Sequence, residues 1–230
     1  MATVLITGAN RGLGLGWTRA FLERGDRVIA TCRRPEQADS LKGLADRFPD
    51  RLQIERLDVA DFDQIERLAE QRRGEAIDIL LNNAGVYGKR DDFGTIDYQE
   101  WHYVLRVNTL APVKLSEVFF DHLRRSQRRL IVAMSSKMGS IGENTSGGSY
   151  LYRSSKAALN MAMKSLSIDL RPYRIGVLIL HPGWVKTDMG GPNALITVEE
   201  SVSGMIKLVE AFRLEMSGRF FDYRGLEIPW

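Results

Sequence analysis

The sequence predicts an α/β fold in which a mostly parallel sheet of about seven strands carries helices on both faces. Short apolar runs alternate with segments of helical periodicity along the 230 residues, and a glycine-rich turn follows the first run. No long linker, repeat or low-complexity tract interrupts this order. We therefore expect a single doubly wound domain of the Rossmann type over residues 1–230, with enough apolar residues for one sizeable core.

The strands and helices are predicted from the period of their apolar residues. The expected strands are 4–7, 27–31, 52–57, 78–81, 129–135, 176–180 and 218–221. The expected helices are 13–24, 61–72, 98–107, 110–125, 152–170 and 198–212. Three loop-like segments, 87–94, 139–149 and 188–196, each follow a predicted strand. They should therefore lie at the carboxyl edge of the sheet, where ligands bind in such folds.

A glycine-rich turn links the first strand to the first helix. Gly8, Gly12 and Gly14 have the spacing G-x-x-x-G-x-G, and the helix after them ends before Gly25. Glycines let the backbone turn tightly and let a pyrophosphate approach the first turn of the helix. The strand before and the helix after distinguish a nucleotide-binding motif from an ordinary glycine-rich turn.

A tyrosine and a lysine are spaced for proton transfer. Tyr152 lies four residues before Lys156 in a predicted helix, so both side chains leave the same helical face. The ammonium should favour the phenolate and make the phenol a better proton donor. Tyr150 is the alternative donor, but Ser154, four residues after it, offers no positive charge. A hydride-carrying nucleotide beside such a donor predicts the reduction of a carbonyl group.

The end of the second strand indicates which nicotinamide cofactor binds. An NAD site usually has an acidic residue there, but this strand is followed by Cys32, Arg33 and Arg34. Arg11 also lies within the glycine loop. Two guanidinium groups suit the 2′-phosphate dianion of NADP(H), which a carboxylate would repel. We therefore predict NADP(H) as the cofactor.

Further motifs accompany the glycine loop and the Tyr152–Lys156 pair. They are Asn82-Asn83-Ala84-Gly85, Asn108, Ser135-Ser136 and the segment Pro182-Gly183-Trp184-Val185-Lys186-Thr187. On these motifs the chain resembles the short-chain dehydrogenases/reductases over its whole length. Within that family it is most similar to the small carbonyl-reductase-like branch that includes the C-factor signalling protein and the insect protein sniffer.

The resemblance implies catalytic roles for four residues. Tyr152 would be the general acid in reduction, and Lys156 would support the phenolate and hold the nicotinamide ribose. Ser136 would hydrogen-bond the substrate carbonyl, with Ser135 as the alternative serine. Asn108 would bind a water that links Lys156 to a proton relay.

The cofactor and substrate sites can be assigned in the same way. The expected cofactor-binding residues are Gly8, Asn10, Arg11, Gly12, Leu13, Gly14, Arg33, Asp58, Val59, Asn83, Ala84, Gly85, Tyr152, Lys156, Pro182, Gly183, Val185 and Thr187. Met138, Trp184 and Met189 are expected to line the substrate pocket. Asp188 has no evident acid–base partner in the sequence.

Composition argues against several other classes of protein. The net charge is +3 with scattered Lys and Arg, so we expect no nucleic-acid partner. No apolar run in the sequence is long enough to span a membrane, and we expect no signal peptide before the first strand. Cys32 is the single cysteine, which predicts a reducing, cytoplasmic location. The three histidines are too dispersed in sequence to suggest a metal site.

The sequence thus predicts an NADPH-dependent reductase of aldehydes and ketones. An NADP(H)-binding sensor or signalling protein with little turnover is the alternative, and hydroxysteroids or polyketides are alternative substrates. The family resemblance also implies a homodimer or homotetramer. Helices 110–125 and 152–170, which carry wide apolar stretches, are the expected contact.

Overall fold

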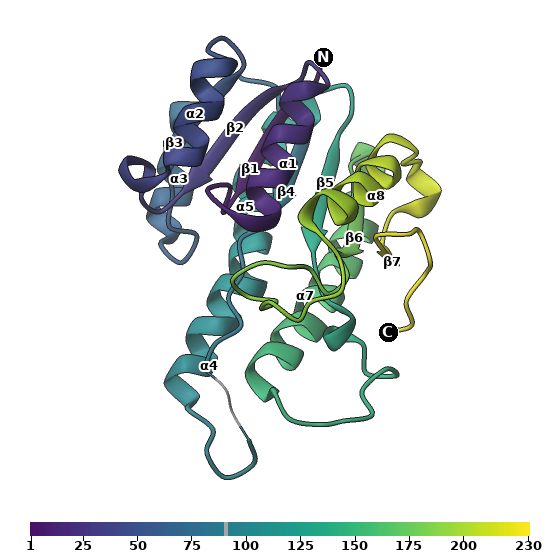
Figure 1. Cartoon of the computed structure of the whole chain (residues 1–230). Coiled ribbons are helices and arrows are strands. Elements are labelled where there is room, and N and C mark those ends of the chain that lie inside the picture. The colour runs from purple at the N-terminus through teal and green to yellow at the C-terminus, as the bar shows by residue number, and fades with distance from the viewer. Residues whose placement is uncertain (90–91) are drawn as a thin grey trace.

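The computed structural model describes residues 1–89 and 92–230 and contains a seven-stranded, fully parallel sheet (Figure 1). The strand order is β3-β2-β1-β4-β5-β6-β7. The strands are β1 (Thr3–Thr7), β2 (Arg27–Cys32), β3 (Leu52–Arg56), β4 (Ile79–Asn82), β5 (Leu130–Met134), β6 (Gly176–His181) and β7 (Arg219–Asp222). The predicted parallel α/β architecture is confirmed, with each strand end within one residue of its expected place.

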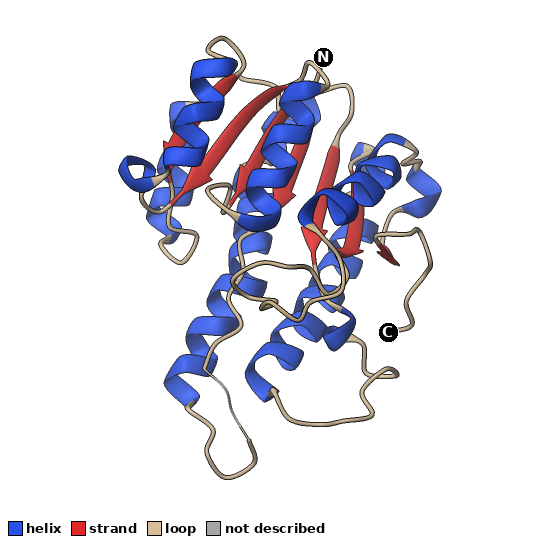
Figure 2. Ribbon diagram, viewed as in Figure 1, coloured by secondary structure: helices blue, strands red, loops and turns tan. Residues whose placement is uncertain are grey.

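Helices cover both faces of this sheet (Figure 2). One face packs against α1 (Gly12–Glu23), α2 (Asp39–Arg47) and α8 (Val198–Glu210). The opposite face packs against α3 (Phe62–Gln71), α5 (Ala111–Val118), α6 (Phe120–Arg125) and α7 (Tyr150–Asp169). Helix α4 (Tyr98–Leu105) runs beside the first half of α7.

Alternating strand residues build a separate core on each face. Val4 and Ile6 of β1 pack toward α1, whereas Leu5 between them packs with the α7 side. All three are fully buried. A strand that is buried on both faces needs a continuous apolar run, which is why β1 shows no alternation of polar and apolar residues.

The helix predictions need three corrections. The sequence analysis missed α2, whose nine residues bury only Leu41 and Leu44. The expected helix 98–107 ends as α4 at Leu105 and continues into a π-helical turn, Arg106–Leu110. The expected helix 110–125 is divided into α5 and α6 at Phe119.

The loops that follow β4, β5 and β6 lie together at the carboxyl edge of the sheet, as predicted (Figure 1). Residues 90 and 91 of the expected loop 87–94 lie outside the described residues. No helix in the described ranges is both long enough and apolar enough to cross a membrane. The carboxyl edge is therefore where the candidate site is found.

Candidate active site

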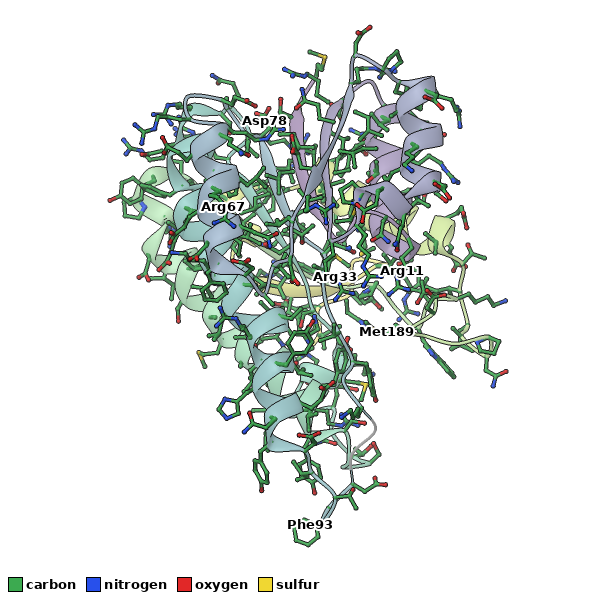
Figure 3. All side chains as sticks on the ribbon, turned by 90° about the vertical axis from the view of Figure 1, so that its left-hand side faces the viewer. Arg11, Arg33, Arg67, Asp78, Phe93 and Met189 are labelled. Atoms are coloured by element: carbon green, nitrogen blue, oxygen red, sulfur yellow. The ribbon has the colours of Figure 1, made fainter. Side chains whose placement is uncertain are left out.

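The main cavity of the structure, of about 530 Å³, opens at the carboxyl edge beside β1, β2 and β4. It gathers most of the residues expected to bind the cofactor. These are Gly8, Asn10, Arg11, Gly12, Leu13, Gly14, Arg33, Asp58, Val59, Asn83, Ala84, Gly85, Tyr152, Lys156, Pro182 and Thr187. Figure 3 shows Arg11 and Arg33 close to Met189, which lines the same cavity.

The glycine loop at the base of this cavity depends on glycine at each motif position. Gly8 and Gly12 have φ angles of 65° and 52°, where a side chain strains the backbone. Gly14 has an ordinary φ, but a Cβ there would lie 2.1 Å from the carbonyl oxygen of Gly8. The loop can therefore pass close to a ligand only with these residues.

The Asn83–Gly85 turn is hydrogen-bonded to the end of β1 and to the glycine loop. The hydroxyl of Thr7 accepts hydrogen bonds from the backbone N–H groups of Asn83 and Ala84, both at 3.0 Å. The amide Nδ2 of Asn83 donates to the carbonyl oxygens of Thr7 at 2.9 Å and Gly8 at 3.2 Å. Since these bonds join the ends of β1 and β4, they set the shape of the cavity floor.

The cavity fits a dinucleotide phosphate. Within the described residues, no side chain caps the N-terminus of α1, so the first N–H groups of the helix remain available to an anion. Arg11 occupies the N-cap position, and Arg33 lies just beyond the end of β2. The Arg33 guanidinium makes no hydrogen bond or ion pair in the part of the chain that the structure describes. An anion can therefore meet both an uncapped helix and an unpaired cation here.

Tyr152 and Lys156 lie on one face of α7, as their spacing predicts. Tyr152 is almost fully buried, and Nζ of Lys156 lies 5.7 Å from the centre of its ring. Burial raises the pKa of Tyr152 to about 12, although a hydrogen bond with Ser136 acts in the opposite direction. The phenol is therefore a weaker acid than the charge of Lys156 leads one to expect, and burial is the main cause.

Lys156 is fixed from two sides. Its Nζ donates a 2.8 Å hydrogen bond to the carbonyl oxygen of Met134 at the end of β5. Gly139 packs so closely that a Cβ there would lie 2.7 Å from the backbone of Lys156. Burial lowers the pKa of Lys156 to about 8. The ammonium is therefore held in place but is easier to deprotonate than an exposed lysine.

Tyr87 is a neighbour of Tyr152 that the sequence analysis missed. The two rings stack with their centroids 4.6 Å apart, and the Tyr87 hydroxyl lies 2.8 Å from Oγ of Ser149. In the sequence, only the position of Tyr87 in the loop after β4 pointed to the site. That signal indicates a site residue but cannot show which side chain it contacts.

Asn108 lies at the centre of the π-helical turn and is fully buried. Its Oδ1 accepts a hydrogen bond from the N–H of Val86, and its Nδ2 donates to the carbonyl oxygen of Val86 and to Oγ of Ser155. The side-chain amide is thus engaged in joining α4, α7 and the loop after β4. Single π-turns inside helices are frequent at functional sites.

The two serines after β5 have different environments. Both are buried, and Ser135 lines the main cavity, but its hydroxyl donates to Oδ1 of Asn160 at 2.5 Å. Ser136 accepts a hydrogen bond from the N–H of Met138 at 3.1 Å and also contacts the Tyr152 hydroxyl. This geometry favours Ser136 as the serine that would meet a substrate beside Tyr152.

The expected substrate-pocket residues do not lie together. Met189 lines the main cavity, whereas Met138 lines a second cavity of about 300 Å³ with Tyr150 and Trp101. Trp184 is half-exposed and donates from Nε1 to the carbonyl oxygen of Gly190.

Two expected cofactor residues also lie apart from the main cavity. Neither Gly183 nor Val185 is among the residues that line it in the described part of the chain. Val185 is instead buried and pairs with Ile196.

Asp188, for which the sequence offered no acid–base partner, forms an ion pair with Arg11. Its Oδ2 accepts a 2.7 Å hydrogen bond from Nη1 of Arg11, and both residues line the main cavity. The two residues are 177 positions apart, so no sequence spacing could have suggested the pair.

Comparisons with known proteins show the family of this chain. The family model for short chain dehydrogenases matches residues 2–194. The chain is 46% identical over 154 residues to the C-signal protein of Myxococcus xanthus, covering 67% of this chain and 93% of that protein. It is also 38% identical to the carbonyl reductase sniffer of D. melanogaster, with a TM-score of 0.95 and full coverage of both chains. The NADPH-bound carbonyl reductase from chicken fatty liver is 36% identical, with a TM-score of 0.94 and coverage of 100% of this chain and 99% of that one. The chain is therefore an oxidoreductase that belongs to the short-chain dehydrogenase family.

Proposed function

We propose that this chain reduces the carbonyl groups of small aldehydes and ketones with NADPH. The observation that carries the proposal is the buried Tyr152–Lys156 pair on the wall of a cavity that fits a dinucleotide, with Ser136 hydrogen-bonded to Tyr152. Two similar structures are described as carbonyl reductases, and one of them has NADPH bound. These likenesses support the same reaction and cofactor for this chain.

The residues of the glycine loop would hold the pyrophosphate of the cofactor at the N-terminus of α1. Arg11 and Arg33 would bind the 2′-phosphate, since both line the cavity and both carry a fixed positive charge. Asp58, Val59 and the Asn83–Gly85 turn would surround the adenosine. When bound, the reduced nicotinamide supplies the hydride for the carbonyl carbon.

Tyr152 would supply the proton. With a pKa of about 12, its hydroxyl is protonated at neutral pH and can donate to the alkoxide that forms on the substrate oxygen. Ser136 would hold that oxygen, and the nearby Lys156 would stabilise the phenolate that remains. Asn108 would position the water through which the proton is replaced.

A sensing or signalling role is the second candidate, because one relative is a signalling protein by name. The two functions differ in turnover. We would measure NADPH oxidation by the purified chain over a panel of aldehydes, quinones, diones and steroids. Turnover of any of them supports the reductase, and the preferred compound shows whether steroids or smaller carbonyls fit. Tight NADPH binding without turnover across the panel favours the sensor. In either case we expect the protein in the cytosol.

A further inference from the structure

The ion pair between Arg11 and Asp188 joins two parts of the main cavity. Arg11 belongs to the glycine loop, and Asp188 follows β6 in the segment that leads to α8. Figure 3 shows Arg11 and Arg33 near Met189, the residue after Asp188. The pair therefore includes one of the two cations expected to bind the cofactor, and the other, Arg33, lines the same cavity.

We propose that Asp188 is a specificity-determining residue that weakens the preference for NADPH over NADH by occupying Arg11. This inference rests on the proposed use of a nicotinamide dinucleotide. It concerns Asp188, whose carboxylate contacts the guanidinium that would otherwise be free for the 2′-phosphate.

Charge fixes the direction of the effect. A 2′-phosphate that approaches Arg11 either displaces the Asp188 carboxylate or remains beside it. Displacement costs the energy of the existing ion pair, and close approach costs repulsion between two anions. Both costs fall on NADPH, while NADH has no 2′-phosphate and can bind with the pair intact. Asp188 therefore opposes NADPH selectively.

The exposure of the Arg11–Asp188 pair limits how much Asp188 can change the affinity for NADPH. The side chains of Arg11 and Asp188 are 68% and 75% exposed, so water and salt screen their attraction. Exposed pairs contribute roughly 0.2–1 kcal/mol, which corresponds to an up to about fivefold change in affinity. Salt should reduce the change further.

The segment that carries Asp188 is held by other contacts. Thr187 accepts a hydrogen bond from Gly190, and its methyl group lies against Gly12. The indole of Trp184 donates to the carbonyl oxygen of Gly190. Asp188→Asn should therefore remove the charge without displacing the segment.

The test is a double-mutant cycle read as the dissociation constants of NADPH and NADH at low and high salt. We expect Asp188→Asn to tighten NADPH about two- to fivefold at low salt and to change NADH less. The gain in NADPH selectivity should shrink at high salt, and it should disappear when Arg11→Ala is already present. Glu199→Gln is the matched control, because Glu199 also lines the cavity but has no recorded ion pair among the described residues.

The outcomes separate this inference from the proposed function. Unchanged NADPH selectivity in Asp188→Asn, or the same gain in the Arg11→Ala background, overturns the inference while the parent chain still binds NADPH. An equal gain in NADPH selectivity from Glu199→Gln also overturns it, because the loss of any negative charge near the cavity would then explain the effect. A parent chain that binds neither cofactor overturns the proposed function together with the inference.

Discussion

Ser135 donates a 2.5 Å hydrogen bond from its hydroxyl to Oδ1 of Asn160, and both side chains are buried. This bond connects the end of β5 to the middle of α7, the helix that carries Tyr152. The neighbouring Ser136 faces the Tyr152 hydroxyl instead. Adjacent serines thus make different contacts: the hydroxyl of Ser135, which lines the main cavity, bonds to Asn160, and that of Ser136 bonds with Tyr152.

The two serines should respond differently to the same substitution. Ser136→Ala should lower carbonyl turnover by about a hundredfold or more, with little loss of NADPH affinity, because the developing oxyanion loses a donor. Ser135→Ala should instead lower the free energy of unfolding by about 1–3 kcal/mol, because Oδ1 of Asn160 loses its partner in the core. Steady-state kinetics and chemical denaturation of both variants check this. The opposite pattern would assign the substrate to Ser135.

Arg33 should determine the cofactor preference together with Arg11. Arg33→Ala should weaken NADPH about ten- to a hundredfold and leave NADH nearly unchanged, because only NADPH carries the 2′-phosphate. Arg34→Ala is the matched control, since Arg34 is the next residue and is not among those that line the cavity in the described part of the chain. Titration of each variant with both cofactors is the measurement. Equal losses for NADPH and NADH would show that Arg33 does not contact the phosphate.

The buried lysine should make stability depend on pH. The pKa of Lys156 is about 8 in the folded chain against 10.5 for an ordinary lysine, so the unfolded chain holds more protons between these values. Stability should therefore rise with pH through this window, and the cost of burying the charge is fully present below pH 8.

This pH effect can be separated from those of other groups. Lys156→Met removes the titration and keeps much of the side-chain volume, so its stability should rise less than that of the parent from pH 8 to pH 10. Denaturant unfolding across that range is the measurement. Above pH 10 the raised pKa of Tyr152 should reverse the trend, because the unfolded phenol ionises first. If the free energy of unfolding changed with pH equally in parent and variant, Lys156 would not be the group responsible.

The outer surface of α7 should hold subunits together. Met161 and Ile168 are 69% and 61% exposed, and their spacing of seven residues places them on one stripe of the helix. We expect the parent chain to be a dimer or tetramer in light scattering and Met161→Glu to be a monomer. Phe93→Glu is the control, because Phe93 is also exposed but lies at the far tip of the molecule (Figure 3). A monomeric parent chain would exclude this interface.

The site could be predicted from the sequence where it depends on local spacing. Tyr152 and Lys156 share a face because they lie one helical turn apart in one helix, and the glycine loop depends on neighbouring residues. Contacts between distant segments could not be predicted. The stacking of Tyr87 on Tyr152 and the pairing of Arg11 with Asp188 both require the sheet to bring its loops together.

The burial of individual side chains and the presence of short helices could not be predicted from the sequence either. The charge of Lys156 predicted a better proton donor at Tyr152, but burial raises the pKa of Tyr152, and burial depends on how much water the fold excludes. Helix α2 was missed because it is short, contains Gly43 and buries few apolar side chains. Its formation depends on packing against the sheet rather than on a strong pattern of its own.

The most direct test of the proposed reduction compares Tyr152→Phe with Tyr150→Phe. Both substitutions remove one hydroxyl from the first turn of α7. Of the two tyrosines, Tyr152 lines the main cavity and Tyr150 lines the second cavity. Turnover of a reactive dione should fall about 10²–10⁴-fold in Tyr152→Phe, while NADPH binding and thermal unfolding stay close to those of the parent. Tyr150→Phe should retain the parent's turnover. Near-parent turnover in Tyr152→Phe would contradict the account, and its loss in Tyr150→Phe alone would transfer the proton-donating role to Tyr150.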